Sequence, residues 1–373
     1  MRFAKHIMGI ESSGIRKCFD GAGPGAVNLS IGQPDFDTPG HIKEAAIRAI
    51  ERGMTGYTPN LGIPELRAAI CEKLRRENGI TCSADQVMVT SGASEALFLA
   101  IAAVTSPGDE VLMPDPGFVS YRPLVQTAGG RPVGVPLDQN LKLSVDTVAE
   151  HITPRTSAII VNSPANPTGA VQSKSEIRGL AELAEDNGIA LISDEVYEHF
   201  IYEGEHVSPG RYSESVITVN AVSKTYAMTG WRLGYLAAPQ EAIDVMLRIH
   251  QYIQACASSI SQAAALAAIT GPQDCVREMR ETFQRRRDVM VRGLRDLGVD
   301  LVVPKGAFYI FPRVGDGDEF AARLSSAGVI TVPGSAFGAN GRPYIRISYA
   351  ASDESLKLAL ERMKAVINIP EAR

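Results

Sequence analysis

Between residues 86 and 255 the chain alternates short apolar runs with longer segments of helical periodicity, and this alternation limits the fold more than any other feature. The apolar runs predict buried strands at residues 86–90, 110–113, 157–162, 189–193, 216–220 and 233–238. Helical patterns lie between most of them, as at residues 94–105, 174–187 and 241–255. Strands that are apolar along their whole length need cover on both faces. The pattern therefore predicts an α/β fold with a mainly parallel sheet between helices.

The last third of the chain has a different pattern. Apolar residues recur at helical spacing through a long charged segment, at Val276, Met279, Phe283, Met290, Leu294 and Leu297. Strand-like runs follow at residues 306–311 and 344–349, and a closing helix is expected from Asp353 to about Ile367. We expect an N-terminal arm over residues 1–14, a large domain over residues 45–270, and a smaller α+β domain built from residues 15–44 and 271–373.

Composition excludes several classes of protein. The net charge of -5 argues against a nucleic-acid-binding surface. The five cysteines (Cys18, Cys71, Cys82, Cys256 and Cys275) form no Cys-x-x-Cys pair, so neither a disulfide framework nor a zinc site is expected and a reducing compartment fits. The six histidines form no metal-binding motif. Neither a signal peptide nor a membrane-spanning run is found, so we expect a cytoplasmic protein with no membrane contact.

A lysine follows one of the predicted strands directly. Ser223-Lys224 comes after the run at residues 216–220, and open α/β sheets place their ligands at the carboxyl ends of strands. A partly desolvated lysine has a lowered pKa and can form an imine with an aldehyde. Ser223 and Arg232 offer a hydroxyl and a guanidinium to a phosphate. The alternative is a surface Ser-Lys pair.

Two further strands end in polar residues. Asp194, followed by Tyr197, could hold a pyridine nitrogen in its protonated form, or could instead cap a helix. Asn166 lies in the loop NSPANPTG at residues 162–169, where prolines hold the backbone extended and make it a fixed amide donor, although a plain loop would fit too. Arg346, in the strand at residues 344–349, could bind a carboxylate or form an edge-strand salt bridge.

The segment at residues 88–96 runs from a strand through Ser91-Gly92-Ala93-Ser94 into a helix. The N–H groups and dipole at such a helix start attract an anion such as phosphate. The spacing matches neither the dinucleotide-binding motif nor the P-loop. A tight turn capped by serine or glycine is the other interpretation.

Together, these motifs resemble the class I aminotransferases among the fold-type I pyridoxal-phosphate enzymes. The resemblance covers nearly the whole chain and includes IGQPDFDTP at residues 31–39, GYTPN at residues 56–60, GIPELR at residues 62–67 and DPGFVSY at residues 115–121. It is strongest to the archaeal and bacterial branch with aspartate-type and aromatic-type members. The resemblance implies an α/β fold with a seven-stranded sheet in the large domain and pyridoxal 5'-phosphate as cofactor.

The resemblance also implies a role for each site residue. Lys224 would hold the cofactor as a Schiff base and then act as the proton shuttle, and Asp194 would pair with the pyridinium nitrogen. The other cofactor-binding residues would be Ala93, Ser94, Phe118, Asn166, Tyr197, Ser223, Arg232 and, from a neighbouring subunit, Tyr57. The substrate would be held by Gly32, Asn166 and Arg346. The reach of Tyr57 implies a homodimer with shared active sites.

These roles predict ping-pong transamination between an L-amino acid and a 2-oxo acid. Aspartate and aromatic amino acids are the favoured donors, and 2-oxoglutarate/glutamate is the expected co-substrate. Many aspartate-type relatives stack a tryptophan on the cofactor, whereas Phe118 has no donor for a second carboxylate. A lyase or synthase with the same cofactor is the alternative reaction, and a non-catalytic cofactor-binding regulator is the alternative class.

Overall fold

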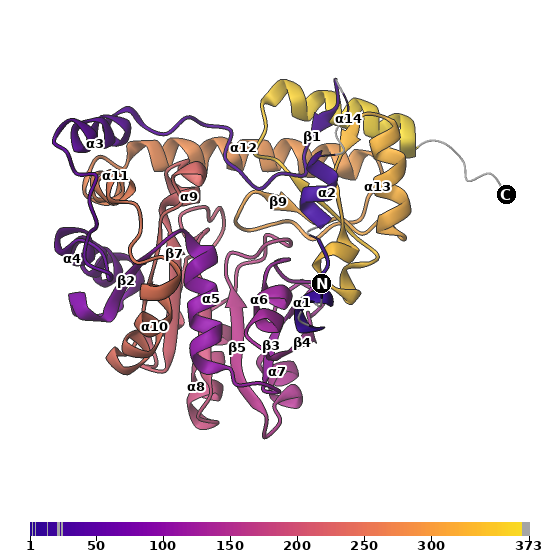
Figure 1. Cartoon of the computed structure of the whole chain (residues 1–373). Helices are drawn as coiled ribbons and strands as arrows, with labels where there is room; N and C mark the ends of the chain where they lie inside the picture. The colour runs from indigo at the N-terminus through magenta and orange to yellow at the C-terminus, as the bar shows by residue number, and fades with distance from the viewer. Residues whose placement is uncertain (2, 4, 13, 21–22, 24, 368–373) are drawn as a thin grey trace.

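A seven-stranded sheet forms the centre of the computed structural model, which describes residues 1, 3, 5–12, 14–20, 23 and 25–367 (Figure 1). The strand order is β2-β8-β7-β6-β5-β3-β4, and only β8 runs antiparallel to its neighbours. The strands are β2 (Val87–Thr90), β3 (Glu110–Asp115), β4 (Arg131–Pro136), β5 (Thr156–Asn162), β6 (Ala190–Asp194), β7 (Val216–Ala221) and β8 (Gly234–Ala237). The predicted α/β fold with a mainly parallel sheet is confirmed.

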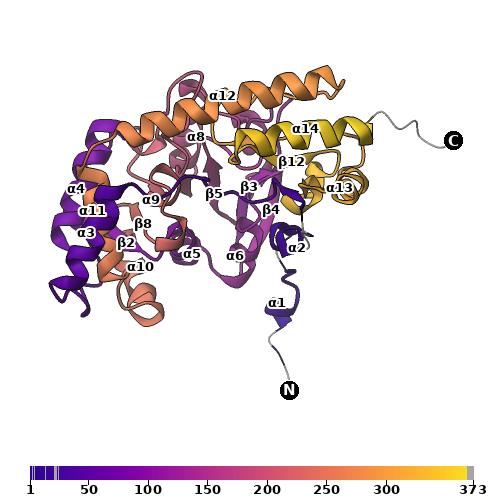
Figure 2. The same ribbon diagram turned by 90° about the horizontal axis from the view of Figure 1, so that it is seen from above.

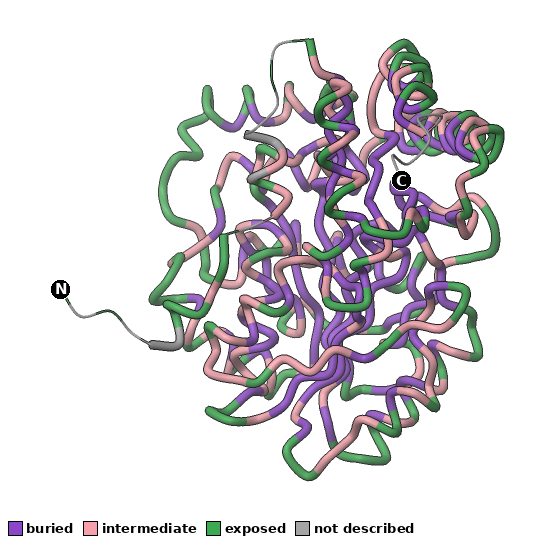
Figure 3. Tube along the Cα trace, turned by 90° about the vertical axis from the view of Figure 1, so that its right-hand side faces the viewer, coloured by how far each residue is buried: buried purple, intermediate pink, exposed green. Residues whose placement is uncertain are grey.

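Helices cover both faces of this sheet because successive side chains of each strand point to opposite faces. On β5, Ile160 packs with helices α5 (Ala93–Val104), α6 (Tyr121–Thr127) and α10 (Gln240–Ile253). Its neighbours Ile159 and Val161 pack with α7 (Val145–His151) and α8 (Lys174–Asp186) on the other face. The central strands are therefore buried on both sides, as the band of buried trace through the middle of Figure 3 shows.

A further group of helices packs beside β2. It consists of α3 (Gly40–Glu51), α4 (Pro64–Lys73) and α11 (Ser259–Thr270), which share an apolar cluster that includes Ile42, Ile70 and Ala265. A π-helical turn, η1 (Leu74–Asn78), extends α4, and Gly79 ends it in the left-handed region at φ 69°.

The smaller lobe contains a second sheet, with β11 (Val332–Pro333), β12 (Ile345–Ser348) and β9 (Tyr309–Ile310) antiparallel in that order. The early β1 (Val27–Asn28) pairs with β10 (Val329–Ile330), so the chain's start joins its last third. Helices α13 (Gly317–Ser326) and α14 (Asp353–Ile367) pack here, and α1 (Lys5–Met8) and α2 (Gly14–Asp20) precede β1. The predicted bounds of the arm and the two domains stay a prediction.

One long helix, α12 (Asp274–Asp296), runs from the side of the molecule that carries α11 to the side that carries α14 (Figures 1 and 2). Its apolar face matches the predicted helical spacing, and Phe283 packs edge-on against Phe200 and at a tilt against Phe308. Among the described residues no helix is both long and apolar enough to cross a membrane.

The short strands β10 and β11 were not predicted, and the structure also differs from the prediction at β4 and β9. The edge strand β4 was not predicted, since Pro132, Gly134 and Pro136 interrupt its apolar pattern. The strand predicted at residues 306–311 is limited to Tyr309–Ile310. Gly306 and Ala307 bond to loops instead: the N–H of Gly306 donates to the carbonyl of Gly169, and that of Ala307 to the carbonyl of Phe200.

Candidate active site

A cavity of about 200 Å³ lies at the carboxyl ends of β5, β6 and β7, where residues of the smaller lobe close over the large sheet. We call it the site cavity. Eleven of the predicted site residues line it: Gly32, Ala93, Ser94, Phe118, Asn166, Asp194, Tyr197, Ser223, Lys224, Arg232 and Arg346. Residues far apart in the sequence therefore meet in one place, because parallel strands end at one edge of the sheet.

Lys224 lies in the single turn α9 (Val222–Thr225), directly after β7. Its Nζ donates to the carbonyl of Gly32 at 2.7 Å, and Ser223 beside it is buried. Burial lowers the pKa of Lys224 to about 8, and the charges of Arg232 and Arg346 act in the same direction. The amine is partly desolvated, so the alternative of a surface Ser-Lys pair is wrong.

Asp194 ends β6 and is buried. Its Oδ2 accepts from the Tyr121 hydroxyl at 2.8 Å, and its Oδ1 from the N–H of Val196 at 3.4 Å. Burial raises the pKa of Asp194 to about 6, although the bond from Tyr121 and the charge of Lys224 oppose the rise. A turn rather than a helix follows, so Asp194 is no helix cap. A buried carboxylate of this kind favours a cationic partner.

The start of α5 and Arg232 form the positively charged end of the cavity. Gly92 caps α5 with φ 79°, and a Cβ there would lie 2.6 Å from Nη2 of Arg232. A Cβ on Gly234 would lie 2.6 Å from the nitrogen of Ala93, so the second glycine lets β8 approach the helix. Within the described residues no carboxylate lies within ion-pair distance of Arg232. The helix end and the guanidinium together suit an anion.

Arg346 is a buried cation on the middle strand of the small sheet. Its Nη1 donates to Oδ1 of Asn166 at 3.0 Å, its Nη2 donates to the carbonyl of Ser30, and its Nε has no partner. Burial lowers its pKa. No described carboxylate pairs with it, so the alternative of an edge-strand salt bridge is wrong. Its guanidinium lies over the Tyr309 ring at 4.6 Å, which fixes its plane.

Two tyrosines close the cavity between Lys224 and Arg346. The hydroxyls of Tyr197 and Tyr309 are 2.8 Å apart, and burial raises the pKa of both. A Cβ on Gly32 would lie 2.1 Å from the hydroxyl of Tyr309, so only glycine fits there. Asn166 is held by its backbone N–H, which donates to Oδ1 of Asn162 at 2.8 Å.

Three residues that hydrogen-bond to predicted site residues were not predicted from the sequence: Tyr121, Tyr309 and Asn162. They lie in the segments at residues 115–121, 306–311 and 162–169, which the sequence identifies as a family motif, a strand and a loop. The sequence pattern alone does not distinguish a tyrosine at a site from a tyrosine in the core. The spacing of Asn162 and Asn166, four residues apart in a proline-rich loop, was the one available signal.

Tyr57 is the one predicted site residue outside the cavity of its own chain. The residue is 92% exposed, and the predicted contact is with a neighbouring subunit.

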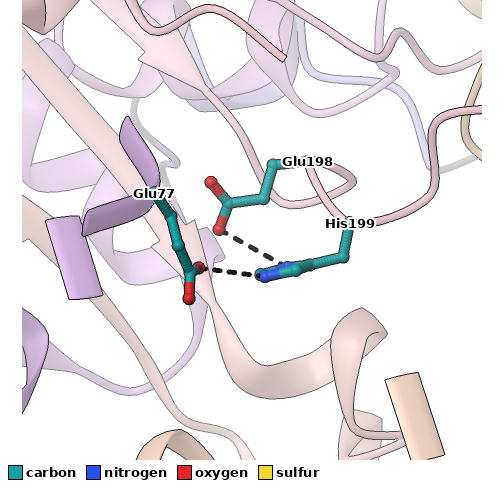
Figure 4. Close-up of side chains that lie close together, drawn as sticks. All are labelled: Glu77, Glu198 and His199. Atoms are coloured by element: carbon teal, nitrogen blue, oxygen red, sulfur yellow. Dashed lines mark hydrogen bonds and ion pairs between the residues drawn. The ribbon is translucent and has the colours of Figure 1, made fainter. Parts of the chain in front are cut away.

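After Asp194 the chain enters a largely buried network of polar and charged side chains, which we call the Glu198 network. It contains Lys73, Glu77, Asn78, Glu195, Glu198, His199 and His206. The ammonium of Lys73 pairs with Glu198, and Asn78 donates to Glu195 at 2.9 Å and to Glu198 at 2.6 Å. His199 lies between Glu77 and Glu198, 3.1 Å and 3.6 Å away (Figure 4). These contacts hold the turn after Asp194 against η1 and the end of α4.

Comparison with known proteins identifies the family of this chain. The family model "Aminotransferase class I and II" matches residues 24–363. A probable aspartate aminotransferase of Methanocaldococcus jannaschii is 48% identical, covering 96% of this chain and 97% of the relative. An aromatic-amino-acid aminotransferase 2 of Thermococcus litoralis is 44% identical, covering 96% of each chain.

Among solved structures, the aspartate aminotransferase of Thermus thermophilus with maleate superposes with a TM-score of 0.94. It is 42% identical and covers 98% of this chain and 100% of that one. The sequence resemblance and the cavity at the strand ends therefore have one explanation. The chain belongs to the class I and II aminotransferases, in their aspartate and aromatic branch, and is an aminotransferase.

Proposed function

We propose that the enzyme transfers an amino group between an L-amino acid and a 2-oxo acid by a ping-pong mechanism, with pyridoxal 5'-phosphate bound in the site cavity. One observation carries the proposal. A lysine whose pKa is lowered to about 8, a buried carboxylate and two arginines without carboxylate partners among the described residues line the same cavity.

The cavity residues fit the cofactor group by group. Arg232, Ser223, Ser94 and the N–H groups at the start of α5 would hold its phosphate. Asp194 would supply the anion that a protonated pyridine nitrogen requires, and that cation would in turn relieve the cost of burying the carboxylate. Phe118 would stack on the ring, and Tyr197 and Asn166 would donate to its phenolic oxygen.

The protein's own residues then perform distinct tasks. When bound, the cofactor supplies an electron sink that stabilises negative charge at the substrate's Cα. Lys224 would hold the cofactor and, once displaced by the substrate amine, would remove the proton from Cα and return it to the cofactor. Because burial lowers its pKa to about 8, a much larger fraction of Lys224 than of an ordinary lysine is the neutral base at neutral pH. Asp194 would keep the ring nitrogen protonated throughout.

Arg346 would orient the substrate by its α-carboxylate. A buried guanidinium with an unpaired Nε gains a carboxylate as counter-ion, with Asn166 and Gly32 beside it. We infer aspartate, aromatic amino acids or both as donors, because the relatives carry those names. Phe118 offers no donor to a second carboxylate, which favours acceptance of apolar side chains. Glutamate with 2-oxoglutarate is the proposed second pair.

Product analysis tests the proposal against a lyase or synthase. The loaded enzyme is given one amino acid and one 2-oxo acid, and both products are quantified. Transamination predicts one new oxo acid for each new amino acid. Ammonia or carbon dioxide released in place of a new amino acid would show the lyase or synthase reaction. Bound cofactor with no turnover of any amino acid would show a regulator.

A further inference from the structure

Two of the five cysteines lie in contact. Cys71 is in α4, and Cys82 is in the segment that leads into the short helix η2 (Ala84–Gln86) before β2. Their Sγ atoms are 3.5 Å apart, with the thiol of Cys82 donating to that of Cys71. All five cysteines are free, and in the described part of the chain no other two sulfurs are hydrogen-bonded.

The two segments are held together independently of the thiols. Nη1 of Arg67 in α4 donates to the carbonyl of Ala84 at 2.8 Å and pairs with Asp85 at 3.2 Å. Beside Cys82, the N–H of Ser83 donates to Oε1 of Gln86 at 3.0 Å and fixes the start of η2. Since the backbone on each side is fixed, the sulfurs stay close, and a bond between them needs only a small movement of the side chains.

The two thiols differ in their surroundings. The hydrogen bond from Cys82 lowers the pKa of Cys71, and the charge of Arg67 adds to this effect against burial. Donating that bond raises the pKa of Cys82, as does its burial. Both side chains are only half-buried, so a small oxidant can reach them. Thiolate character and access are what make a cysteine reactive.

We propose that Cys71 and Cys82 are a redox modification site, which closes to a disulfide in the presence of a small disulfide oxidant such as oxidised glutathione. The Cys71 thiolate attacks one sulfur of the oxidant, forms a mixed disulfide and expels one glutathione thiolate. Cys82 loses its proton and attacks the Cys71 sulfur, which expels the second glutathione thiolate. Two protein thiols are oxidised, and one oxidant disulfide is reduced to two thiols.

The bond would close a short loop around η1. That loop carries Lys73, Glu77 and Asn78, the members of the Glu198 network that connect α4 and η1 to the turn after Asp194. A disulfide there restricts the unfolded chain and so stabilises the fold. The oxidised enzyme is expected to have a higher midpoint of thermal unfolding than the reduced enzyme, and reduction is expected to reverse the shift.

Mass spectrometry of the full-length enzyme tests the site. The protein is treated with oxidised glutathione, its remaining thiols are alkylated, and it is digested without reductant. We expect a peptide that links Cys71 to Cys82, loss of two of the five free thiols, and recovery of all five after reduction. A wild-type digest with Cys71 and Cys82 both alkylated, or each carrying its own glutathione, would overturn the proposal.

Single variants test the order of the two steps. Cys82→Ser is expected to keep one glutathione on Cys71, because the second thiol is missing. Cys71→Ser is expected to bind glutathione at Cys82 at least tenfold more slowly. Cys256→Ser is the matched control and is expected to form the Cys71–Cys82 link as the wild type does. Faster modification of Cys82 than of Cys71 would contradict the assigned roles.

Discussion

Arg346 and Arg232 are two arginines of one cavity with different surroundings. Arg346 is buried and touches Asn166 and Ser30, whereas Arg232 is exposed beside the start of α5. Lysine keeps the charge but loses the planar pair of donors. We expect Arg346→Lys to weaken transition-state binding by about 2–5 kcal/mol, the usual cost at a buried hydrogen-bonded charge pair.

The matched control is Arg232→Lys. Arg346→Lys should show a raised KM for the amino acid and a normal cofactor affinity. Arg232→Lys should show a lowered cofactor affinity and a normal KM for the amino acid. Steady-state kinetics at varied amino acid and cofactor concentrations measure both quantities. Equal losses of cofactor affinity in the two variants would contradict the separate roles of the two arginines.

Tyr121 acts through Asp194 and gives a prediction about pH. Burial raises the pKa of Asp194 to about 6, and the hydrogen bond from Tyr121 partly offsets that rise. Tyr121→Phe removes the bond, so the carboxyl pKa rises further. The ionised form of Asp194 is the one that would hold a pyridinium. As the pH is lowered, cofactor affinity should therefore begin to fall at a higher pH in Tyr121→Phe than in the wild type. Dissociation constants measured from pH 5 to 8 check this, and superimposable profiles would refute it.

At this scale the charged and polar site residues were predictable, since each follows a strand or lies in a family motif. Lys224, Asp194 and Arg346 are rare residues in apolar surroundings and therefore visible in the sequence. Tyr121 and Tyr309 were not predictable, because their hydroxyls matter only through partners that are 73 and 112 residues away along the chain.

Among the elements, η1 and the turn after β6 depend on the Glu198 network. Glu198 is buried. Burial acts to raise its pKa, but the charges of Lys73, His199 and His206 and the hydrogen bond from Lys73 together outweigh burial and lower the pKa. Glu198→Gln leaves Lys73 without its nearest partner, so we expect a loss of about 3–5 kcal/mol in the free energy of unfolding. Chemical denaturation at pH 7 measures this loss.

Glu182→Gln is the matched control, because the pair of Glu182 with Arg178 is exposed on both sides. A change within about 0.5 kcal/mol is expected there. Equal effects in the two glutamate variants would show that the network does not stabilise the turn.

The strands and helices differ in how well the sequence reveals them. The central strands and α14 match their predicted ranges to within about two residues, since burial on both faces or a full helical face leaves a strong pattern. The edge strand β4 does not, because its two prolines and its glycine are tolerated only where one side lacks a neighbour. The Glu198 network could not be predicted either, since its members come from three separate segments of the chain.

For the whole molecule, the proposed homodimer explains why Tyr57 is exposed. If Tyr57 completes the site of its neighbour, a hybrid of Tyr57→Ala and Lys224→Ala subunits contains one site with both native residues. Each parent should be impaired at low cofactor concentration, and the refolded mixture should regain activity. Activity no greater than the average of the parents would contradict shared sites.

The two-lobed plan was predictable from the change in periodicity after residue 270, and the class of enzyme from the family motifs. The covering of the cavity by the smaller lobe was not, because the pairing of β1 with β10 joins segments about 300 residues apart. Local patterns carry no information about such pairings.

Transamination by Lys224 and its cavity, with pyridoxal 5'-phosphate as cofactor, is the proposed reaction. The most direct test is the half-reaction. The purified protein is loaded with the cofactor, single amino acids are added without any oxo acid, and the absorbance of the bound cofactor is followed. We expect glutamate, together with aspartate or with phenylalanine and tyrosine, to convert the cofactor to its amine form. Lys224→Ala should show no such conversion at catalytic rates. Conversion by no amino acid in the wild type, or normal conversion in Lys224→Ala, would contradict the proposed reaction.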